Sequence, residues 1–363
     1  MKRILILTAS FGEGHNSAAR AIRDAIDARD GVTSEIADLY ALSIPKANVA
    51  IQHLYTIAIN HFPRIWQGIF VALDRPGLME STLWTGAPME RTLGRKITEF
   101  RPDAIISTYP LYAYLYRKLQ RSRLGLKAPF YTVITDSVGV NSAWHRCLSD
   151  GFCVADQETA DLLAGRGVSP EILHPLGFPV AKAYADFARS QIPTPPPWKL
   201  LFMPSTQLNR TLDQIRSLLT IPDVQLTVLA GKHIRIFDGV NASGLVDGER
   251  CRLVGWSDAM PRLISEHHVF IGKAGGAIVQ EALAAQCPFI VSHLVPGQEE
   301  GNIALIERLG IGARAYESTG QLLSTVETMI ANDRKQWSDW KANLAIKSNP
   351  GASDRIANLV LGQ

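Results

Sequence analysis

The chain has 363 residues, and at roughly 150 residues per domain this length predicts two or three domains. A hydrophobic fraction of 46% and a charged fraction of 20% are typical of a globular protein and exclude a disordered or collagen-like chain. The net charge of +3 is too small to indicate a nucleic-acid partner, and none is expected.

The four cysteines indicate neither a disulfide framework nor a metal site. They form no Cys-x-x-Cys pair, so reduced thiols in a cytoplasmic protein are expected. The apolar run at residues 4–7 is too short for a signal peptide. No run of about 18 apolar residues occurs, so we expect a soluble protein that at most lies on a membrane surface.

The first half of the chain alternates between predicted strands and helices. Residues 4–8 form an apolar run typical of a buried parallel strand, and residues 17–28 place apolar side chains at helical spacing. Further strands are predicted at 33–37, 104–107, 130–135 and 151–154. This alternation predicts an α/β domain with a parallel sheet.

The composition changes near residue 190. Residues 191–197 contain four prolines, which favours an extended linker. The alternation then restarts, with strands predicted at 199–203, 224–229, 252–254, 269–271 and 289–292. We therefore expect an α/β protein with two domains. The expected division is a first domain at 1–190, a linker at 191–198, a second domain at 199–345, and a C-terminal helix at 346–363 that packs back on the first domain.

A glycine-containing turn follows the first predicted strand. Gly12 and Gly14 allow a sharp turn that brings backbone N–H groups toward an anion at the start of a helix. The pattern nearly matches a dinucleotide fingerprint, but Ser17 replaces its third glycine, while Asp38 stands where a ribose ligand could sit. His15 in this turn is either a general base for a hydroxyl or a polar loop residue.

A second glycine-rich turn lies between a predicted strand and a predicted helix. Gly275 and Gly276 would leave the first amides of that helix free, which makes a cradle suited to a diphosphate. Glu281 follows within plausible reach of a ribose diol. Lys273 is a candidate cation for the leaving group or a surface residue. The alternative is a glycine-rich turn without such a role.

The segment 296–302 gathers polar side chains after another predicted strand. Gln298, Glu299 and Asn302 could hydrogen-bond several hydroxyl groups, which is how proteins recognise a sugar. A solvated acidic loop is the alternative interpretation.

Two neighbouring stretches favour a membrane surface when they are taken together. Residues 47–73 are rich in apolar and aromatic side chains, including Trp66 and Phe70, which fits either a core helix pair or a lipid-contacting segment. Residues 91–127 contain nine basic and two acidic residues, which fits either a solvated surface or attraction to anionic lipid headgroups.

These motifs resemble the monogalactosyldiacylglycerol synthase and processive diacylglycerol glucosyltransferase family. More distantly, they resemble the peptidoglycan glycosyltransferase acting on undecaprenyl-linked muramyl-pentapeptide. The resemblance runs in order through both halves and covers most of the chain. It rests on residues 8–15, 133–136 with Trp144 and His145, 254–261, 272–281 and 296–302.

The resemblance implies a GT-B fold, with two Rossmann-like domains facing each other across a cleft. The first domain would bind the acceptor and face the membrane, and the second would bind a UDP-sugar. The implied reaction moves a hexosyl group from UDP-glucose or UDP-galactose to diacylglycerol, which makes a membrane glycolipid. The implied location is the cytoplasm, with peripheral attachment to an anionic phospholipid membrane.

The resemblance also implies roles for individual residues. His15, helped by Asp136, would take the proton from the acceptor hydroxyl. The other candidates would contact the UDP-sugar: Gly275 and Gly276 the diphosphate, Glu281 the ribose, Trp256 to Met260 the uracil, and Gln298 and Glu299 the sugar, with Gly12, Gly14, Ser205 and Asn302 completing the set. The chain departs from the family pattern at Ala274, where proline is common, and in the loop 204–207, which lacks the usual glycines.

The sequence also bears on metal dependence. No two aspartates are separated by a single residue, so the Asp-x-Asp metal signature of the other large glycosyltransferase fold is absent and no cofactor is expected. Helix N-terminal amides and cationic side chains would then stabilise the leaving UDP.

Other functions stay open at this point. They are transfer of N-acetylglucosamine to a polyprenyl-linked cell-wall precursor, UDP-sugar binding without catalysis, and a nicotinamide-dependent oxidoreductase that would use Gly12 and Asp38. The identity of the sugar and of the lipid acceptor, the anomeric configuration, processivity and the oligomeric state are not predicted.

Overall fold

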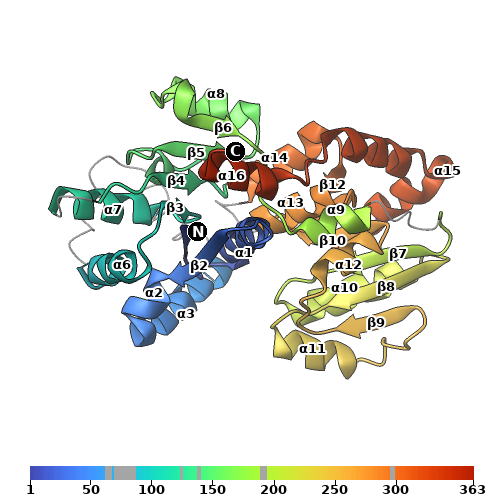
Figure 1. Cartoon of the computed structure of the whole chain (residues 1–363). Coiled ribbons are helices and arrows are strands. Elements are labelled where there is room, and N and C mark those ends of the chain that lie inside the picture. The colour runs from blue at the N-terminus through green and yellow to red at the C-terminus, as the bar shows by residue number, and fades with distance from the viewer. Residues whose placement is uncertain (62–67, 69–86, 123–125, 137–139, 189–193, 295–298) are drawn as a thin grey trace. The chain divides into compact units, whose positions relative to one another are not determined.

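Figure 1 shows the computed structural model of the chain, which describes residues 1–61, 68, 87–122, 126–136, 140–188, 194–294 and 299–363. For residues 55–61 only the backbone is described. The chain forms two compact units. The first comprises Met1–Lys182 and Pro350–Gln363, and the second comprises the described residues between them.

The first unit is built on a six-stranded sheet in which all neighbouring strands are parallel. The strand order is β2-β1-β3-β4-β5-β6. Its strands are β1 (Lys2–Thr8), β2 (Val32–Asp38), β3 (Ala104–Ser107), β4 (Phe130–Val133), β5 (Gly151–Val154) and β6 (Leu173–Pro175). Because helices cover a parallel sheet on both faces, the residues of β3 are all buried, as are Ile4 to Thr8 of β1.

Helices pack around this sheet. They are α1 (Glu13–Asp27), α2 (Leu39–Ser43), α3 (Pro45–His61), α6 (Ala87–Phe100), α7 (Leu111–Ser122), α8 (Gln157–Gly165) and α16 (Ala352–Leu361), with short 3₁₀ turns η2 (Ser142–Trp144) and η3 (Pro170–Ile172). The predicted strands at 104–107 and 151–154 are confirmed to the residue. The predicted first helix is confirmed too, but it begins at Glu13 rather than at residue 17.

The second unit repeats this architecture with a second six-stranded parallel sheet, of order β12-β11-β10-β7-β8-β9. Its strands are β7 (Trp198–Phe202), β8 (Val224–Leu229), β9 (Cys251–Val254), β10 (Val269–Lys273), β11 (Phe289–His293) and β12 (Gly312–Arg314). Its helices are α9 (Lys182–Ala188, which starts at the unit boundary), α10 (Leu208–Leu219), α11 (Ile234–Asn241), α12 (Met260–Ser265), α13 (Gly276–Ala284), α14 (Glu300–Leu309) and α15 (Thr319–Lys347).

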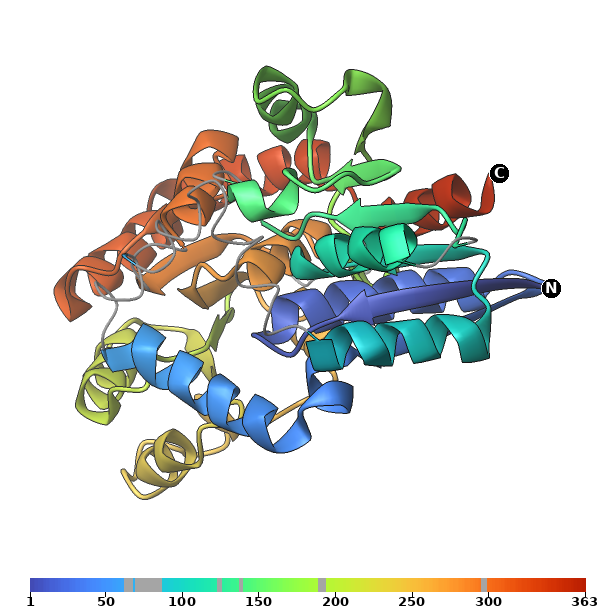
Figure 2. The same ribbon diagram turned by 90° about the vertical axis from the view of Figure 1, so that its left-hand side faces the viewer.

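The C-terminal helix α16 packs on the first unit. Its apolar residues Ile356 and Val360 join the core formed by Ile22 of α1 and the strands. Lys2 Nζ donates a hydrogen bond of 2.5 Å to the Leu361 carbonyl oxygen, which holds the two chain ends together (Figure 2).

Each sheet has one point where the chain reverses the direction in which it adds strands. In the first sheet this point lies between β1 and β3, and in the second between β10 and β7. In open parallel sheets, ligands bind at the carboxyl ends of the strands beside such a point. The loops that follow β1, β3 and β4, and those that follow β7 and β10, are therefore where each unit should carry its functional side chains.

Candidate active site

His15 lies at the strand-order reversal of the first unit, in the first turn of α1. Its ring Nδ1 is 2.9 Å from the hydroxyl of Thr135, which follows β4. The hydroxyl of Thr108, which follows β3, donates a 3.1 Å hydrogen bond to the carbonyl oxygen of His15. Three strand ends thus fix the position of this histidine.

Asp136, which the resemblance implies as a helper of His15, lies near it. Its Oδ2 accepts a 2.6 Å hydrogen bond from Nε1 of Trp144, and its charge acts on His15. Burial lowers the pKa of His15 from 6.5, although the Asp136 charge opposes that shift. Burial likewise raises the pKa of Asp136, although Trp144 and His15 oppose that shift. A neutral imidazole at pH 7 is the form that can accept a proton.

Aromatic rings border the histidine. The Tyr109 ring meets the His15 ring edge-on at 5.3 Å, and the Trp144 ring lies 6.0 Å from it. Tyr109 also contacts Phe11 and Tyr40, at 5.9 Å and 5.8 Å. Aromatic rings and polar groups thus both border His15, a mixed environment that suits an amphiphilic substrate.

The glycine turn before His15 has a structural role that the sequence also predicted. Gly12 caps α1 with φ of 93°, a backbone conformation that favours glycine. Asp38, the candidate ribose ligand of an oxidoreductase, is engaged within the protein instead. Its Oδ2 accepts hydrogen bonds from the amide and hydroxyl of Ser10, and its Oδ1 accepts one from the amide of Ala41. This engagement argues against the nicotinamide interpretation, since no carboxylate oxygen is left without a protein donor.

The second glycine turn lies at the strand-order reversal of the second unit. Gly275 is the N-cap of α13 and Gly276 its first residue, so the first amides of the helix lack partners within it. A Cβ atom at Gly275 would approach other atoms no closer than 3.7 Å, so packing does not demand a glycine there. Close approach of a ligand to the backbone would explain a glycine at this position.

Glu281 lies one turn further along α13 and is half-buried. It accepts a hydrogen bond from the hydroxyl of Tyr184 on α9, and Tyr184 itself is only 3% exposed. Burial, together with the adjacent carboxylate, raises the pKa of the tyrosine, so it stays a donor. Sequence reasoning missed Tyr184, because it lies almost a hundred residues before its partner.

The loops after β7, β8 and β9 carry the remaining candidates. Trp256 is 52% exposed, and Nζ of Lys232 lies 3.9 Å from the centre of its ring. Met260 is the first residue of α12. The Ser205 hydroxyl accepts a 3.3 Å hydrogen bond from the Gln207 amide just before α10. Lys232 was not predicted, although it occupies a loop after a predicted strand.

The residues predicted to bind the sugar have different contacts within the protein. Glu299 is buried, and its Oε1 lies 3.5 Å from Nζ of Lys273, the predicted phosphate cation. Asn302 is 5% exposed, and its Nδ2 donates a 2.8 Å hydrogen bond to the carbonyl oxygen of Ala274. Asn302 therefore fastens the glycine turn to α14. Gln298 lies outside the described residues.

The charge of Lys273 acts on two histidines that were not predicted as site residues. Burial, with help from Lys273 and Arg210, lowers the pKa of His293 at the end of β11 to about 3. Burial and Lys273 also lower the pKa of His233 after β8. Both histidines are therefore neutral at pH 7. Arg210 of α10 donates hydrogen bonds to the carbonyl oxygens of Ser292 and Tyr316.

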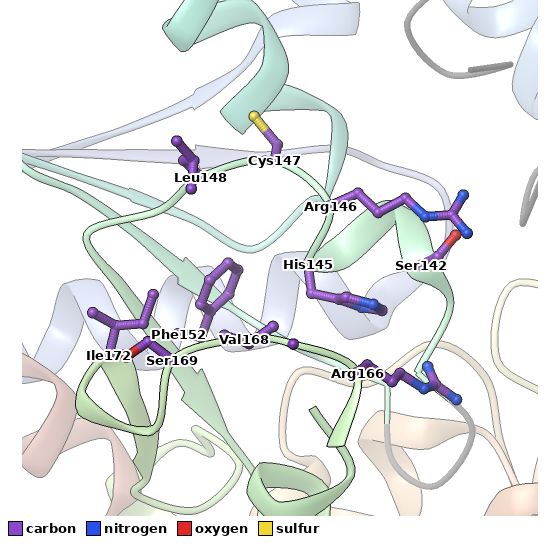
Figure 3. A pocket seen from close by; sticks show the side chains of 11 residues that line it. Ser142, His145, Arg146, Cys147, Leu148, Phe152, Arg166, Val168, Ser169 and Ile172 are labelled. Carbon is purple, nitrogen blue, oxygen red and sulfur yellow. The ribbon is translucent and has the colours of Figure 1, made fainter. Parts of the chain in front are cut away.

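A cavity of about 690 Å³ opens in the first unit, apart from these residues (Figure 3). Phe152 and Ile172 line one side, and His145, Arg146 and Arg166 line the other (Figure 3). Arg166 donates a 2.5 Å hydrogen bond to the carbonyl oxygen of Val140, and His145 directly follows Trp144. The cavity therefore borders the segment that holds Asp136, but it does not contain His15.

Comparison with solved structures identifies the fold. Over 100% of both chains it matches MurG of Acinetobacter baumannii, with a TM-score of 0.65 and 13% identity. Over the same coverage it matches UDP-GlcNAc 2-epimerase of Neisseria meningitidis bound to UDP-GlcNAc, with a TM-score of 0.62 and 13% identity. Phytolacca americana UGT2 matches with a TM-score of 0.62 and 14% identity over 100% of this chain and 99% of that one. The predicted GT-B fold is confirmed.

Sequence comparisons identify similar proteins. Residues 15–180 match the model of the monogalactosyldiacylglycerol (MGDG) synthase family. A processive diacylglycerol beta-glucosyltransferase of Bacillus cereus (strain AH820) is 22% identical over 99% of this chain and 94% of its own length. One of Bacillus thuringiensis (strain Al Hakam) is 23% identical over 99% and 93%. The resemblance to the MGDG synthase family that the motifs indicated is confirmed, and the chain is a glycosyltransferase of the hexosyltransferase class.

Proposed function

We propose that this protein transfers a hexosyl group from a UDP-sugar to the hydroxyl of diacylglycerol. The observation that carries the proposal is the His15 cluster, a neutral histidine with Asp136 beside it and aromatic rings around it. The relatives named for diacylglycerol glucosyl transfer match over 99% of the chain, which supports the same acceptor.

In the proposed reaction, His15 takes the proton of the acceptor hydroxyl as the oxygen attacks the anomeric carbon. The bond from that carbon to the UDP oxygen breaks, and UDP leaves with the electron pair. Asp136 stabilises the positive charge that forms on His15, because its carboxylate lies near the ring.

The second unit would hold the donor. The free amides of α13 at Gly275 and Gly276 and the Lys273 ammonium would stabilise the diphosphate as negative charge develops on it. Glu281 would accept hydrogen bonds from the ribose hydroxyls. Trp256 would stack on the uracil, and Glu299, which already binds Lys273, would contact the sugar.

Chelation is expected to leave the transfer rate nearly unchanged. In the proposed reaction, amides and Lys273 neutralise the leaving UDP, and the chain has no Asp-x-Asp pair to hold a catalytic metal. The measurement is the initial rate of transfer with and without EDTA. A hundredfold loss that Mg²⁺ or Mn²⁺ restores would contradict this expectation.

The proposed acceptor is insoluble, so the protein must reach a membrane surface. Among the described residues no helix is long and apolar enough to cross a membrane. The predicted lipid-contacting segment includes α3, on which Val49, Ile51 and Leu54 are exposed at 67%, 38% and 65%. Trp66 and Phe70 lie outside the described residues. These exposed apolar side chains support contact with lipid.

The basic stretch is less available than its charge suggests. Three of its cations form ion pairs with acidic residues outside the stretch. The pairs are Lys96 with Glu35 at 2.5 Å, Arg117 with Asp150 at 3.2 Å, and Lys118 with Glu90 at 2.6 Å. Arg91 and Arg121 are exposed. Attraction to anionic lipid would therefore depend on such residues more than on the whole stretch, and Arg123 lies outside the described residues.

Binding to vesicles is expected to need both anionic lipid and the exposed apolar side chains of α3. Co-sedimentation at low and high salt should show that Arg91/Arg121→Glu loses the salt-sensitive part and Val49/Leu54→Ser the salt-resistant part. The matched control is Arg216/Lys335→Glu, which reverses two exposed charges on the second unit. Equal binding of all variants to neutral and anionic vesicles would contradict this expectation.

The proposed function itself is tested with purified full chain, each UDP-hexose in turn, and vesicles that contain diacylglycerol. Lipid chromatography should show one labelled sugar in the lipid fraction. The second arm of the assay offers UDP-N-acetylglucosamine as the donor and a polyprenyl-linked acceptor. This arm tests the other reaction that the resemblance predicts.

A further inference from the structure

The hydroxyl of Thr135 is a buried hydrogen-bond partner of the His15 ring. It lies 2.9 Å from Nδ1 of His15, and the residue is 6% exposed. The backbone of Thr108 also hydrogen-bonds the imidazole ring. Nδ1 is therefore paired with Thr135 inside the protein, and the proposed reaction would use Nε2 as the base.

The state of the ring decides whether the histidine can act. Neutral imidazole carries its proton on one of its two nitrogens. The hydrogen bonds that the ring makes set which nitrogen this is. If Nδ1 carries the proton and donates it to Thr135, the lone pair of Nε2 is free to accept a proton. If Nε2 carries the proton, it is a hydrogen-bond donor and cannot serve as a base.

We infer that Thr135 is a positioning residue that accepts the Nδ1–H of His15 and so keeps Nε2 as the basic nitrogen. This inference rests on the proposed function, because it needs His15 to accept a proton from the acceptor hydroxyl. When Nε2 takes that proton, the ring becomes an imidazolium, and its Nδ1–H still donates to Thr135. The hydroxyl therefore serves both the resting and the protonated ring.

No charged group competes with Thr135 for Nδ1 among the described neighbours. Asp136, after β4, acts on the ring through its charge, while its Oδ2 binds Trp144. Tyr109, after β3, meets the ring with its edge at 5.3 Å. Asp38, the last residue of β2, is held by Ser10. A neutral hydroxyl orients the ring here without fixing a charge beside Nδ1.

Two variants separate the hydroxyl from the shape of the side chain. Thr135→Val keeps the shape and removes the hydroxyl, whereas Thr135→Ser keeps the hydroxyl. We expect roughly a tenfold loss of kcat in the valine variant, an unchanged KM for the donor, and recovery in the serine variant. Thr135→Ala is the substitute if the valine variant does not fold.

The second readout does not depend on turnover. ¹⁵N NMR of the full chain, labelled at histidine and assigned by comparison with His15→Asn, reports the tautomer of His15. We expect the Nδ1–H form in the wild type and in Thr135→Ser, and a mixed population in Thr135→Val.

A wild-type ring protonated mainly on Nε2 would overturn the inference, as would a valine variant with wild-type kcat and tautomer. Loss of activity in valine and serine variants alike would also overturn it, because the hydroxyl would then not be the cause. Absence of any sugar transfer by the wild type would instead refute the proposed function, while the NMR result would still decide the role of Thr135.

Discussion

His15→Ala is expected to lower the rate of sugar transfer by about 10²–10⁴-fold, the usual cost of losing a general base. UDP should bind the variant almost as it binds the wild type. The reason is that His15 lies in the first unit, whereas the proposed uracil, ribose and diphosphate contacts all lie in the second. The measurements are kcat with saturating donor and UDP affinity by calorimetry.

The matched control is His174→Ala, which removes another half-buried histidine of the first unit that lies on β6. It should keep its activity. If His15→Ala retains most of its activity at pH 7, His15 is only a loop residue and Asp136 becomes the better candidate for the base.

The pH dependence follows from the same site. Burial lowers the pKa of His15 from 6.5, so the neutral, proton-accepting form persists below that pH. The rate should stay on its plateau at pH 7 and fall only on the acid side of pH 6.5. A rate that still rises between pH 7 and 8 with a single ionisation would contradict a base of lowered pKa.

Glu281→Ala is expected to weaken UDP binding by about 1–3 kcal/mol, the cost of losing a charged hydrogen-bond partner. The carboxylate is half-buried and held by Tyr184, so it is oriented before the ligand arrives. Calorimetry with UDP and with 2′-deoxy-UDP makes the test specific, because the deoxy ligand should lose less affinity on mutation.

Glu281→Gln keeps the size of the side chain and a partner for Tyr184, so it separates charge from packing. Glu317→Ala, an exposed glutamate of the same unit, is the control and should bind UDP normally. Unchanged UDP affinity in a folded Glu281→Ala would remove Glu281 from the ribose site.

Local sequence patterns predicted most of the sheet strands but missed two. Strands such as 104–107 and 224–229 stood out because their apolar runs are bounded by turns. β6 and β12 were missed because each has three residues, too few to show a period, and β6 ends in proline. Their place in the sheet comes from pairing with β5 and β11, which no local pattern carries.

Candidate residues that lie next to a strand end could be proposed from the sequence, whereas partners contributed by distant segments could not. His15, Gly275 and Glu281 follow predicted strands, so the topology of parallel sheets indicated them. The partners Thr135 and Tyr184 could not be found in this way, because each meets its residue only after folding. The ion pairs of the basic stretch with Glu35 and Asp150 could not be found in this way either, because these acids come from other elements.

The central claim, sugar transfer to diacylglycerol, is tested most directly by counting both products of one reaction. Purified wild-type protein receives a radiolabelled UDP-hexose with and without diacylglycerol vesicles, beside His15→Ala. The account predicts that lipid-bound sugar and UDP form in equal amounts, only when diacylglycerol is present, and at least a hundredfold more slowly in the variant. UDP release without label in the lipid, or conversion of the sugar nucleotide without release of UDP, would contradict it.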